Sequence, residues 1–266
     1  MGIGENGNKP VAIVTGGGTG IGAATAALLS ESGWDVAICG RRASLLDKVA
    51  AETGARAIPV DMSVESSAEE VVGSVLDQFG RIDGVVLNAA IARAGSFSET
   101  SDWLWREMLE TNLVSAARLT RAVISHFPDS GGSVVGVASL AALRASSFLS
   151  GYAASKAGLG LMLQSVAVEF GKAGVRANLV CPGLVKTEMS ASSLSAVAER
   201  DGVSLDAAYD LATRPVPLRR AGASSEIASV IAFLLSEGAS YLTGTIIPVD
   251  GGASAVDVAA LVYEDN

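Results

Sequence analysis

The chain has 266 residues, of which 49% are hydrophobic and 18% are charged, and its formal net charge is −9. This length can supply one domain with a large hydrophobic core. The acidic balance and the lack of any block of Lys and Arg argue against a nucleic-acid or anionic-membrane surface, so we expect small molecules or copies of the chain itself as partners.

The cysteines and the N-terminus bear on cellular location. Cys39 and Cys181 lie in apolar segments, and their separation fits neither a metal site nor a disulfide framework. We therefore expect no metal and a cytoplasmic location. The start, MGIGENGNKP, is unlike the basic opening of a secretory signal, and residues 1–8 are expected to be flexible. The uncharged run 11–30 has a glycine-rich centre that argues against a membrane span.

Short β-branched runs alternate with longer amphipathic segments along the chain. Strands are predicted at 11–15, 34–40, 55–60, 82–88, 132–139, 175–181 and 245–249, and helices near 21–32, 43–53, 64–79, 101–126, 151–172 and 224–236. Strands that are apolar on both faces and alternate with helices are typical of a parallel sheet covered on both sides. We predict an α/β fold with a doubly wound, mostly parallel seven-stranded sheet and helices on both faces.

No repeat or linker divides the chain, so residues 9–254 are expected to form one domain. The interval 187–223 lacks a predicted strand and is rich in Ser and Ala. We interpret it as a long irregular segment that forms a substrate lid. Residues 255–266 are apolar up to an acidic tip and are expected to be a C-terminal tail that packs on a neighbouring subunit.

The first predicted strand runs into TGGGTGIG at residues 15–22, and a helix follows. Glycines let the backbone turn tightly and approach phosphate groups, and the helix N-terminus offers unpaired N–H donors. The strand–turn–helix context therefore predicts a dinucleotide-binding site, with a ligand-free glycine turn as the alternative.

Tyr152 and Lys156 stand four residues apart in GYAASKAGLG. On a helix they share one face. A lysine cation held near a phenol favours the phenolate and lowers the tyrosine pKa, which gives a general acid or base. The alternative is a tyrosine packed on an Ala-rich helix beside a solvated lysine.

Six motifs in order make the chain resemble the short-chain dehydrogenase/reductase family, in its single-domain form, over Val11 to about Ser254. They are TGxxxGIG at 15–22, LNAA at 87–90 in place of NNAG, Asn112 in TNLVSA, Ser139 thirteen residues before the tyrosine, YxxxK at 152–156, and Pro182-Gly183 followed by Val185 and Thr187. Leu87 and Ala90 depart from the family pattern, which we expect to alter sheet packing or the adenine edge without loss of catalysis.

The resemblance implies a Rossmann-type fold and an NAD(P)-dependent oxidoreductase that transfers a hydride between the nicotinamide and a ketone or secondary alcohol. It assigns four catalytic roles. Tyr152 is the general acid or base, Lys156 lowers its pKa and holds the nicotinamide ribose, Ser139 polarises the substrate oxygen, and Asn112 orders a proton-relay water. Taken alone, Ser139 is also explained as an ordinary strand-end hydroxyl.

The resemblance also carries cofactor contacts to a set of residues along the chain. These are Gly16, Thr19, Gly20, Ile21, Gly22, Arg41, Arg42, Asp61, Met62, Asn88, Ala89, Ala90, Tyr152, Lys156, Pro182, Gly183, Val185 and Thr187. Gly40 stands where NAD enzymes generally place an acidic residue, and two arginines follow it. A guanidinium can bind a 2′-phosphate bidentately, so we predict NADP(H), with NAD(H) as the alternative.

The family's substrate-pocket positions are mostly apolar here: Ala92, Arg93, Leu140, Leu143, Arg144, Phe148 and the lid from Thr187. This set favours a medium-sized, largely apolar ketone or secondary alcohol. His126, the only histidine, ends a helical segment before Pro128 and is interpreted as structural.

Other functions stay open from the sequence alone. A dinucleotide-binding sensor or scaffold could keep the fold without the chemistry, and an epimerase or dehydratase could use the same scaffold. Family members are mostly tetramers, so we expect a homotetramer that pairs the helices predicted at 101–126 and 151–172. The alternative is that these apolar faces belong to the core of the monomer.

Overall fold

Seven strands form one sheet in the residues that this computed structural model describes, 9–257 and 259. They are β1 (Val11–Thr15), β2 (Asp35–Gly40), β3 (Arg56–Pro59), β4 (Gly84–Leu87), β5 (Ser133–Val137), β6 (Arg176–Pro182) and β7 (Ile246–Val249). The strand order is β3-β2-β1-β4-β5-β6-β7, and all neighbours run parallel. The predicted doubly wound sheet is confirmed. Residues 1–8 and nearly all of the expected tail after residue 257 lie outside the described residues.

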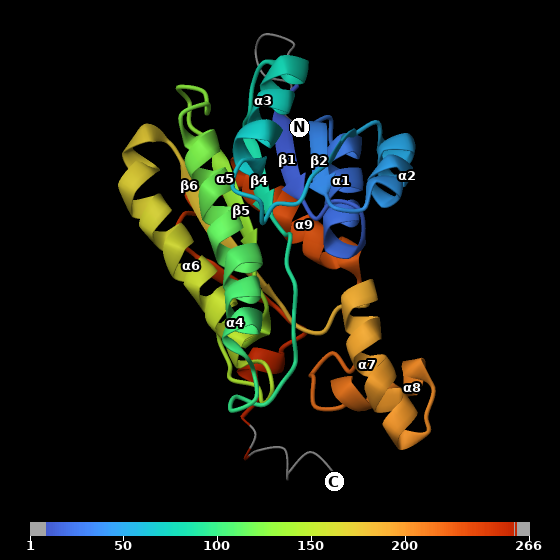
Figure 1. Cartoon of the computed structure of the whole chain (residues 1–266). Helices are drawn as coiled ribbons and strands as arrows, with labels where there is room; N and C mark the ends of the chain where they lie inside the picture. Colours follow the sequence, from blue (N-terminus) through green and yellow to red (C-terminus); the bar gives the residue numbers. More distant parts are fainter. Residues whose placement is uncertain (1–8, 258, 260–266) are drawn as a thin grey trace.

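The helices cover both faces of this sheet (Figure 1). Those outside the predicted lid are α1 (Gly20–Glu31), α2 (Ala43–Thr53), α3 (Ser67–Phe79), α4 (Asp102–Leu109), α5 (Ser115–Ile124), α6 (Ser150–Phe170) and α9 (Ser224–Leu235). Side chains of α3, α5 and α6 pack in one apolar cluster, and those of α1, α2 and α9 pack in another.

Strand β1 shows why its sequence has no polar alternation. Val11 and Ile13 belong to the cluster with α3, α5 and α6, whereas Ala12 and Val14 belong to the cluster with α1, α2 and α9. Successive side chains of a strand point to opposite faces, so a strand covered on both sides must be apolar throughout. Both clusters therefore meet at the sheet and fix the ends of its strands, where the site lies.

The helix predicted at 101–126 is interrupted. A π-helical turn, η1 (Glu110–Val114), separates α4 from α5. Such turns insert one extra residue into a helix and occur often at functional sites. Here the turn contains Asn112, which is buried and bonded to the loop after β4. Helical periodicity alone does not reveal this local change of pitch.

The interval 187–223, predicted as irregular, instead contains two helices, α7 (Glu188–Asp201) and α8 (Leu205–Thr213). They pack against each other as a separate lobe, drawn in orange in Figure 1. The Thr187 and Ser190 side chains form a capping box at the start of α7, and Gly202 ends the helix in a left-handed conformation (φ 65°). The Ser- and Ala-rich composition thus corresponds to two helices that begin with side-chain caps and bury few apolar residues.

No helix among the described residues is both long and apolar enough to cross a membrane.

Candidate active site

A cleft of about 550 Å³ opens at the carboxyl ends of the strands, between the sheet and α7. It is lined by the loops that follow β1, β2 and β4 and by the start of α7. β1 lies between β2 and β4, so the chain reverses its direction of travel across the sheet at this point. In open α/β sheets, ligands bind at this kind of switch point.

The glycine-rich loop after β1 is packed too closely for side chains. Gly16 and Gly20 have positive φ angles of 65° and 54°. A Cβ at Gly22 would stand 2.3 Å from the Gly16 oxygen, and one at Gly20 would stand 3.2 Å from Thr187 Cγ2. The loop therefore keeps its backbone open to the cleft at the N-terminus of α1, and this cradle fits the phosphates of a dinucleotide.

Thr15 and Asn88 join the glycine loop to the end of β4. The Thr15 hydroxyl oxygen accepts hydrogen bonds from the backbone N–H groups of Asn88 and Ala89, both at 2.9 Å. The Asn88 side-chain amide donates to the backbone carbonyl oxygens of Thr15 (2.9 Å) and Gly16 (3.2 Å). These bonds hold two loops that are far apart in sequence in one fixed wall of the cleft, and Asn88 keeps its place despite Leu87 and Ala90 beside it.

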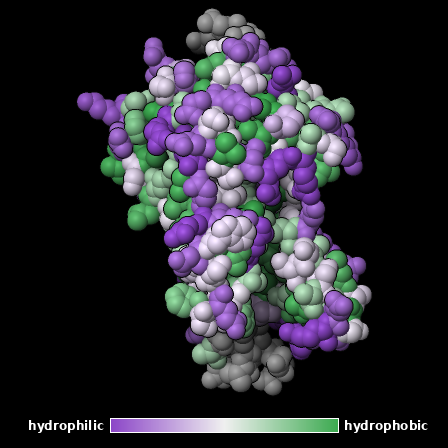
Figure 2. Space-filling view, viewed as in Figure 1, coloured by the Kyte–Doolittle hydropathy of each residue, from purple (hydrophilic) through white to green (hydrophobic). Residues whose placement is uncertain are grey.

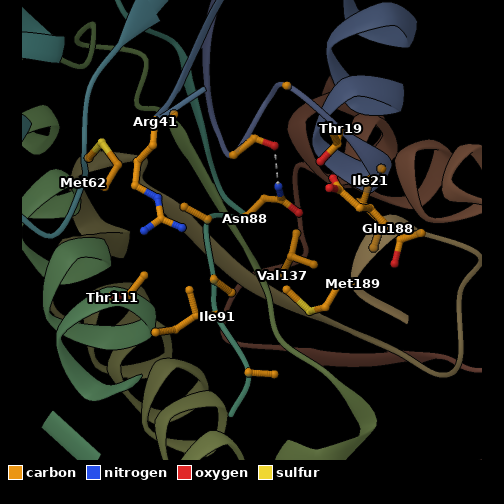
Figure 3. A pocket seen from close by; sticks show the side chains of 18 of the residues that line it. Thr19, Ile21, Arg41, Met62, Asn88, Ile91, Thr111, Val137, Glu188 and Met189 are labelled. Carbon is orange, nitrogen blue, oxygen red and sulfur yellow. Dashed lines mark hydrogen bonds between the residues drawn. The ribbon is translucent and has the colours of Figure 1, made fainter. Parts of the chain in front are cut away.

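The two arginines after β2 lie differently. Arg41 extends into the cavity between Met62 and Asn88 (Figure 3), and in the described part of the chain it has no hydrogen bond or ion pair. Arg42 donates from both terminal nitrogens to the carboxylate of Glu188 on α7, at 2.7 and 2.8 Å. The hydrogen bond from Arg42 holds the pKa of Glu188 below its ordinary value. Arg41 is the cation that is ready for a new anionic partner.

Tyr152 and Lys156 share the inner face of α6, as their spacing predicted. Both line the cleft, and Lys156 Nζ is 5.9 Å from the centroid of the Tyr152 ring. Lys156 is only 2% exposed, and its ammonium donates to the Val137 oxygen at the end of β5 (2.8 Å). The last carbonyl of a central strand thus fixes the position of the lysine.

The pKa values of this pair differ from the expectation. Burial raises the pKa of Tyr152, while a hydrogen bond with Ser139 lowers it and the nearby Cys181 raises it further. Burial lowers the pKa of Lys156 to about 8. The expected lowering of the tyrosine pKa by the lysine is therefore not found, because both groups are withdrawn from water and each favours its neutral form. At neutral pH the phenol keeps its proton.

Asn112 is hydrogen-bonded to the N-terminal half of α6. It is 1% exposed, its Oδ1 accepts the Ile91 N–H (2.8 Å), and its Nδ2 donates to the Ile91 oxygen and the Ser155 hydroxyl, both at 2.9 Å. Ser155 in turn donates to the Tyr152 oxygen at 2.7 Å. Both amide protons of Asn112 are thus engaged in protein hydrogen bonds, and the chain of bonds leads to the backbone of Tyr152.

The predicted substrate side carries ion pairs and one unusual backbone. Arg93 donates to both carboxylate oxygens of Glu107, and Arg144 donates to the Ser254 oxygen at 3.0 Å. Phe148 has φ 66°, uncommon for a bulky residue, and its oxygen accepts the Gly95 N–H at 2.9 Å. Arg93 is thus paired with a carboxylate, whereas the Arg144 guanidinium donates only to backbone carbonyl oxygens.

Most of the predicted cofactor and catalytic residues meet in the cleft. Those that line it are Gly16, Thr19, Gly20, Ile21, Arg41, Arg42, Asp61, Met62, Asn88, Ala89, Ala90, Tyr152, Lys156 and Thr187. Those that do not are Gly22, Asn112, Ser139, Pro182, Gly183 and Val185. The latter include the tightly packed Gly22, the buried Asn112 and Val185, and Ser139, which contacts the cleft through its hydrogen bond with Tyr152.

Two residues with a direct part in this geometry were missed. Glu188 lines the cleft and binds Arg42, and Ser155 connects Asn112 with Tyr152. A carboxylate in the first turn of a capped helix is a common sequence feature, so only the fold reveals that Glu188 faces Arg42. In the part of the chain that the structure describes, no three His, Cys, Asp or Glu side chains gather as metal ligands.

Comparisons with known proteins show which family the chain is similar to. A family model described as enoyl-(acyl carrier protein) reductase matches residues 16–254. Protein MoaE of Klebsiella aerogenes is 37% identical over 95% of this chain and 98% of its own, and meso-2,3-butanediol dehydrogenase of Serratia marcescens is 32% identical over 94% and 96%. A variant of actinorhodin polyketide ketoreductase, solved with NADPH, superposes with a TM-score of 0.88 at 30% identity, over 93% of this chain and 98% of its own.

Proposed function

The chain belongs to the short-chain dehydrogenase/reductase family of NAD(P)-dependent oxidoreductases, and from this premise we propose that it is an NADP(H)-preferring carbonyl reductase or alcohol dehydrogenase. The observation that carries the proposal is the placement of Tyr152 and Lys156 on one helix face at the cleft, opposite the glycine loop. The nicotinamide, when bound, supplies or accepts the hydride.

Tyr152 donates a proton to the carbonyl oxygen in reduction and takes it from the alcohol in oxidation. One carbon–hydrogen bond and one oxygen–hydrogen bond form as the carbonyl double bond becomes single. Because burial raises the pKa of Tyr152, the phenol is protonated at neutral pH and is ready as a general acid. This protonation state favours reduction near neutrality and oxidation at higher pH.

Three further residues place the proton donor and its partners. Ser139, bonded to the phenol, polarises the substrate oxygen. Lys156, fixed by the Val137 carbonyl, holds the ribose hydroxyls with its remaining donors. Asn112 positions the first turns of α6 through Ser155 and orders the relay water, for which one lone pair of its Oδ1 remains.

The preference for NADP(H) rests on the end of β2. Gly40 offers no carboxylate to the ribose hydroxyls, and the Arg41 guanidinium extends into the cleft without a protein partner among the described residues. A guanidinium gains more from a phosphate dianion than from a neutral ribose. The glycine cradle, Asp61 and Met62 complete the nucleotide side, and Pro182, Gly183, Val185 and Thr187 complete the nicotinamide side.

The substrate is a medium-sized ketone or secondary alcohol. Arg93 is engaged with Glu107, so a free carboxylate or phosphate on the substrate finds no unpaired cation at that position. Butanediol dehydrogenase and ketoreductase among the relatives act on alcohols and ketones, in keeping with this class.

One domain, residues 9–254, carries both cofactor and substrate sites in this proposal. Its assembly is a homotetramer, supported by exposed apolar side chains on the outer face of α6, among them Leu161 and Val168, and by Trp103 on α4. Light scattering at micromolar concentration tests this assembly, and a monomer peak would refute it.

The test of function is the oxidation of NADPH and NADH, separately, against ketones, aldehydes and oxo-acids. We expect turnover of at least one ketone and a higher kcat/KM with NADPH. Consumption of NADH equal to that of NADPH refutes the cofactor preference. Tight cofactor binding without turnover of any carbonyl refutes the reductase.

A further inference from the structure

Arg42 joins the lid to the cofactor loop. Its two terminal nitrogens bind the Glu188 carboxylate at 2.7 and 2.8 Å, and one of them lies 3.5 Å from the Thr19 hydroxyl. Arg42 follows β2, Thr19 precedes α1, and Glu188 begins α7. We call the Arg42–Glu188 pair the latch, because it links one wall of the nucleotide cleft to the helix that covers it.

The base of the lid also packs on the glycine loop. A Cβ at Gly20 would stand 3.2 Å from Thr187 Cγ2, so the residue before α7 lies directly against the phosphate cradle. Thr187 and Glu188 both line the cleft. Figure 2 shows the lobe of α7 and α8 beside the main body, with hydrophilic residues where the two meet. The latch is therefore part of the nucleotide site as well as part of the lid.

The cations at this edge of the cleft differ in whether they already have a partner. Arg41 has no partner among the described residues, whereas the end-on edge of the Arg42 guanidinium is occupied by Glu188. The cation just before the lid, Lys186, is paired with Asp206 at 3.2 Å. A phosphate that approaches Arg42 meets a carboxylate already bound there, and two anions on one guanidinium repel each other.

On the basis of the proposed function, we propose that Glu188 is a specificity-determining residue that competes with the 2′-phosphate of NADP(H) for Arg42. With NAD(H), the latch stays closed and α7 is held on the nucleotide cleft. With NADP(H), Arg42 turns from Glu188 to the phosphate, and the base of α7 is released. Glu188 thus reduces the preference for NADP(H) over NAD(H) that the two arginines create.

The pair is exposed, since the side chains of Arg42 and Glu188 are 55% and 60% accessible. Exposed ion pairs contribute little free energy. We therefore expect removal of the Glu188 carboxylate to change the affinity for a 2′-phosphate ligand by a small factor, about threefold. The effect is confined to ligands that carry a 2′-phosphate, which distinguishes it from a general change of the cleft.

Calorimetric binding of adenosine 2′,5′-bisphosphate and of 5′-AMP to wild type, E188Q, R41Q, R42Q and the control D206N tests the proposal. D206N removes a carboxylate from another exposed ion pair, on the other lid helix. We expect E188Q to bind the bisphosphate about threefold more tightly, with AMP unchanged, and D206N to match wild type. An unchanged or weaker bisphosphate affinity in E188Q, or an equal gain for AMP, would overturn the proposal.

Hydrogen exchange of residues 187–196 gives a readout that does not depend on turnover. We expect the bisphosphate to speed exchange in this segment relative to AMP in wild type, and E188Q to show fast exchange with either ligand. Equal exchange with both ligands in wild type would overturn the competition. If R41Q and R42Q both bind the bisphosphate as wild type does, the proposed cofactor preference fails. If they lose affinity while E188Q gains none, only the role of Glu188 fails.

Discussion

The two sides of the cleft are held by different kinds of interaction. The tyrosine wall, which we define as Asn112, Ser139, Tyr152, Ser155 and Lys156, is fixed by buried hydrogen bonds to strand ends and to the loop after β4. Where the lid, residues 187–223, meets the cofactor loop, the contact is the exposed Arg42–Glu188 pair, and Asp206 of its second helix pairs with the exposed Lys186. The wall takes its geometry from the core of the fold, whereas these ion pairs of the lid are exposed to water.

The interactions on the two sides of the cleft also differ in strength. A buried polar group that loses its partner costs about 1–3 kcal/mol, because it is left without water or protein to bond. An exposed ion pair contributes about 0–1 kcal/mol. Changes to the wall and to the glycine loop are therefore expected to reduce stability and function strongly, and changes to the lid to adjust selectivity.

The largest effect is expected for Gly22→Ala. The new Cβ would stand 2.3 Å from the Gly16 oxygen, so the loop must shift from the helix it packs on. We expect a loss of about 2–4 kcal/mol in the free energy of unfolding and at least tenfold weaker NADPH binding. Gly73→Ala on α3 is the matched control, since its Cβ meets nothing within 4 Å. Denaturant unfolding and fluorescence titration measure both, and equal effects of the two substitutions would contradict a close-packed cradle.

Asn112→Ala follows in size. It leaves the N–H and carbonyl of Ile91 and the Ser155 hydroxyl without their present partners. We expect urea unfolding to show a loss of about 2–3 kcal/mol, with kcat reduced more than the affinity for NADPH because the start of α6 loses its support. A variant within about 0.5 kcal/mol of wild type would show that the wall is held by other contacts.

The buried ammonium of Lys156 predicts a rise of stability with pH. Its pKa is about 8 in the folded chain and about 10.4 when unfolded, so between these values the unfolded state binds more protons. The free-energy cost of burying the ammonium is present below pH 8 and disappears as the pH rises toward 10. We expect Lys156 to add about 1–2 kcal/mol to the free energy of unfolding between pH 7.5 and 9.5, against the buried thiols of Cys39 and Cys181, whose pKa values are raised to about 12 and about 11 and whose contribution falls over the same range.

Lys156→Met is the control for that measurement, because it removes the titrating group and keeps the side-chain volume. The two thiols remain in this variant, so the difference in free energy of unfolding between wild type and Lys156→Met should rise by that amount over the same pH range. An identical pH dependence in both proteins would assign the proton to another group.

The smallest effect is expected in the lid. Asp206→Asn breaks an ion pair whose side chains, Lys186 and Asp206, are 58% and 86% exposed. We expect a change below about 0.5 kcal/mol in thermal or urea unfolding. A loss above 1 kcal/mol would mean that the lid is held as firmly as the wall, and the contrast between the two sides would fall.

The sequence predicted the sheet, the glycine turn and the Tyr152–Lys156 pair for physical reasons. The apolar strands and the four-residue spacing each follow from local rules of backbone and helix geometry. Asn112, Ser139 and most of the other predicted cleft residues came from the family resemblance, and Ser155 was missed.

What the sequence did not predict depends on contacts between distant segments. The π-helical turn at Asn112 exists because the side chain bonds to Ile91 and Ser155. The lid helices form with little apolar patterning, and the pairing of Arg42 with Glu188 joins residues 146 positions apart. The raised pKa of Tyr152 likewise comes from burial, which spacing along a helix does not reveal.

Turnover and NADPH binding by Tyr152→Phe test the central claim most directly. The phenol is the proposed proton donor, and the change removes only its hydroxyl. We expect kcat to fall by at least about 1000-fold, while the dissociation constant for NADPH stays within about twofold of wild type. Turnover that remains within tenfold of wild type would show that another group moves the proton and would contradict the account.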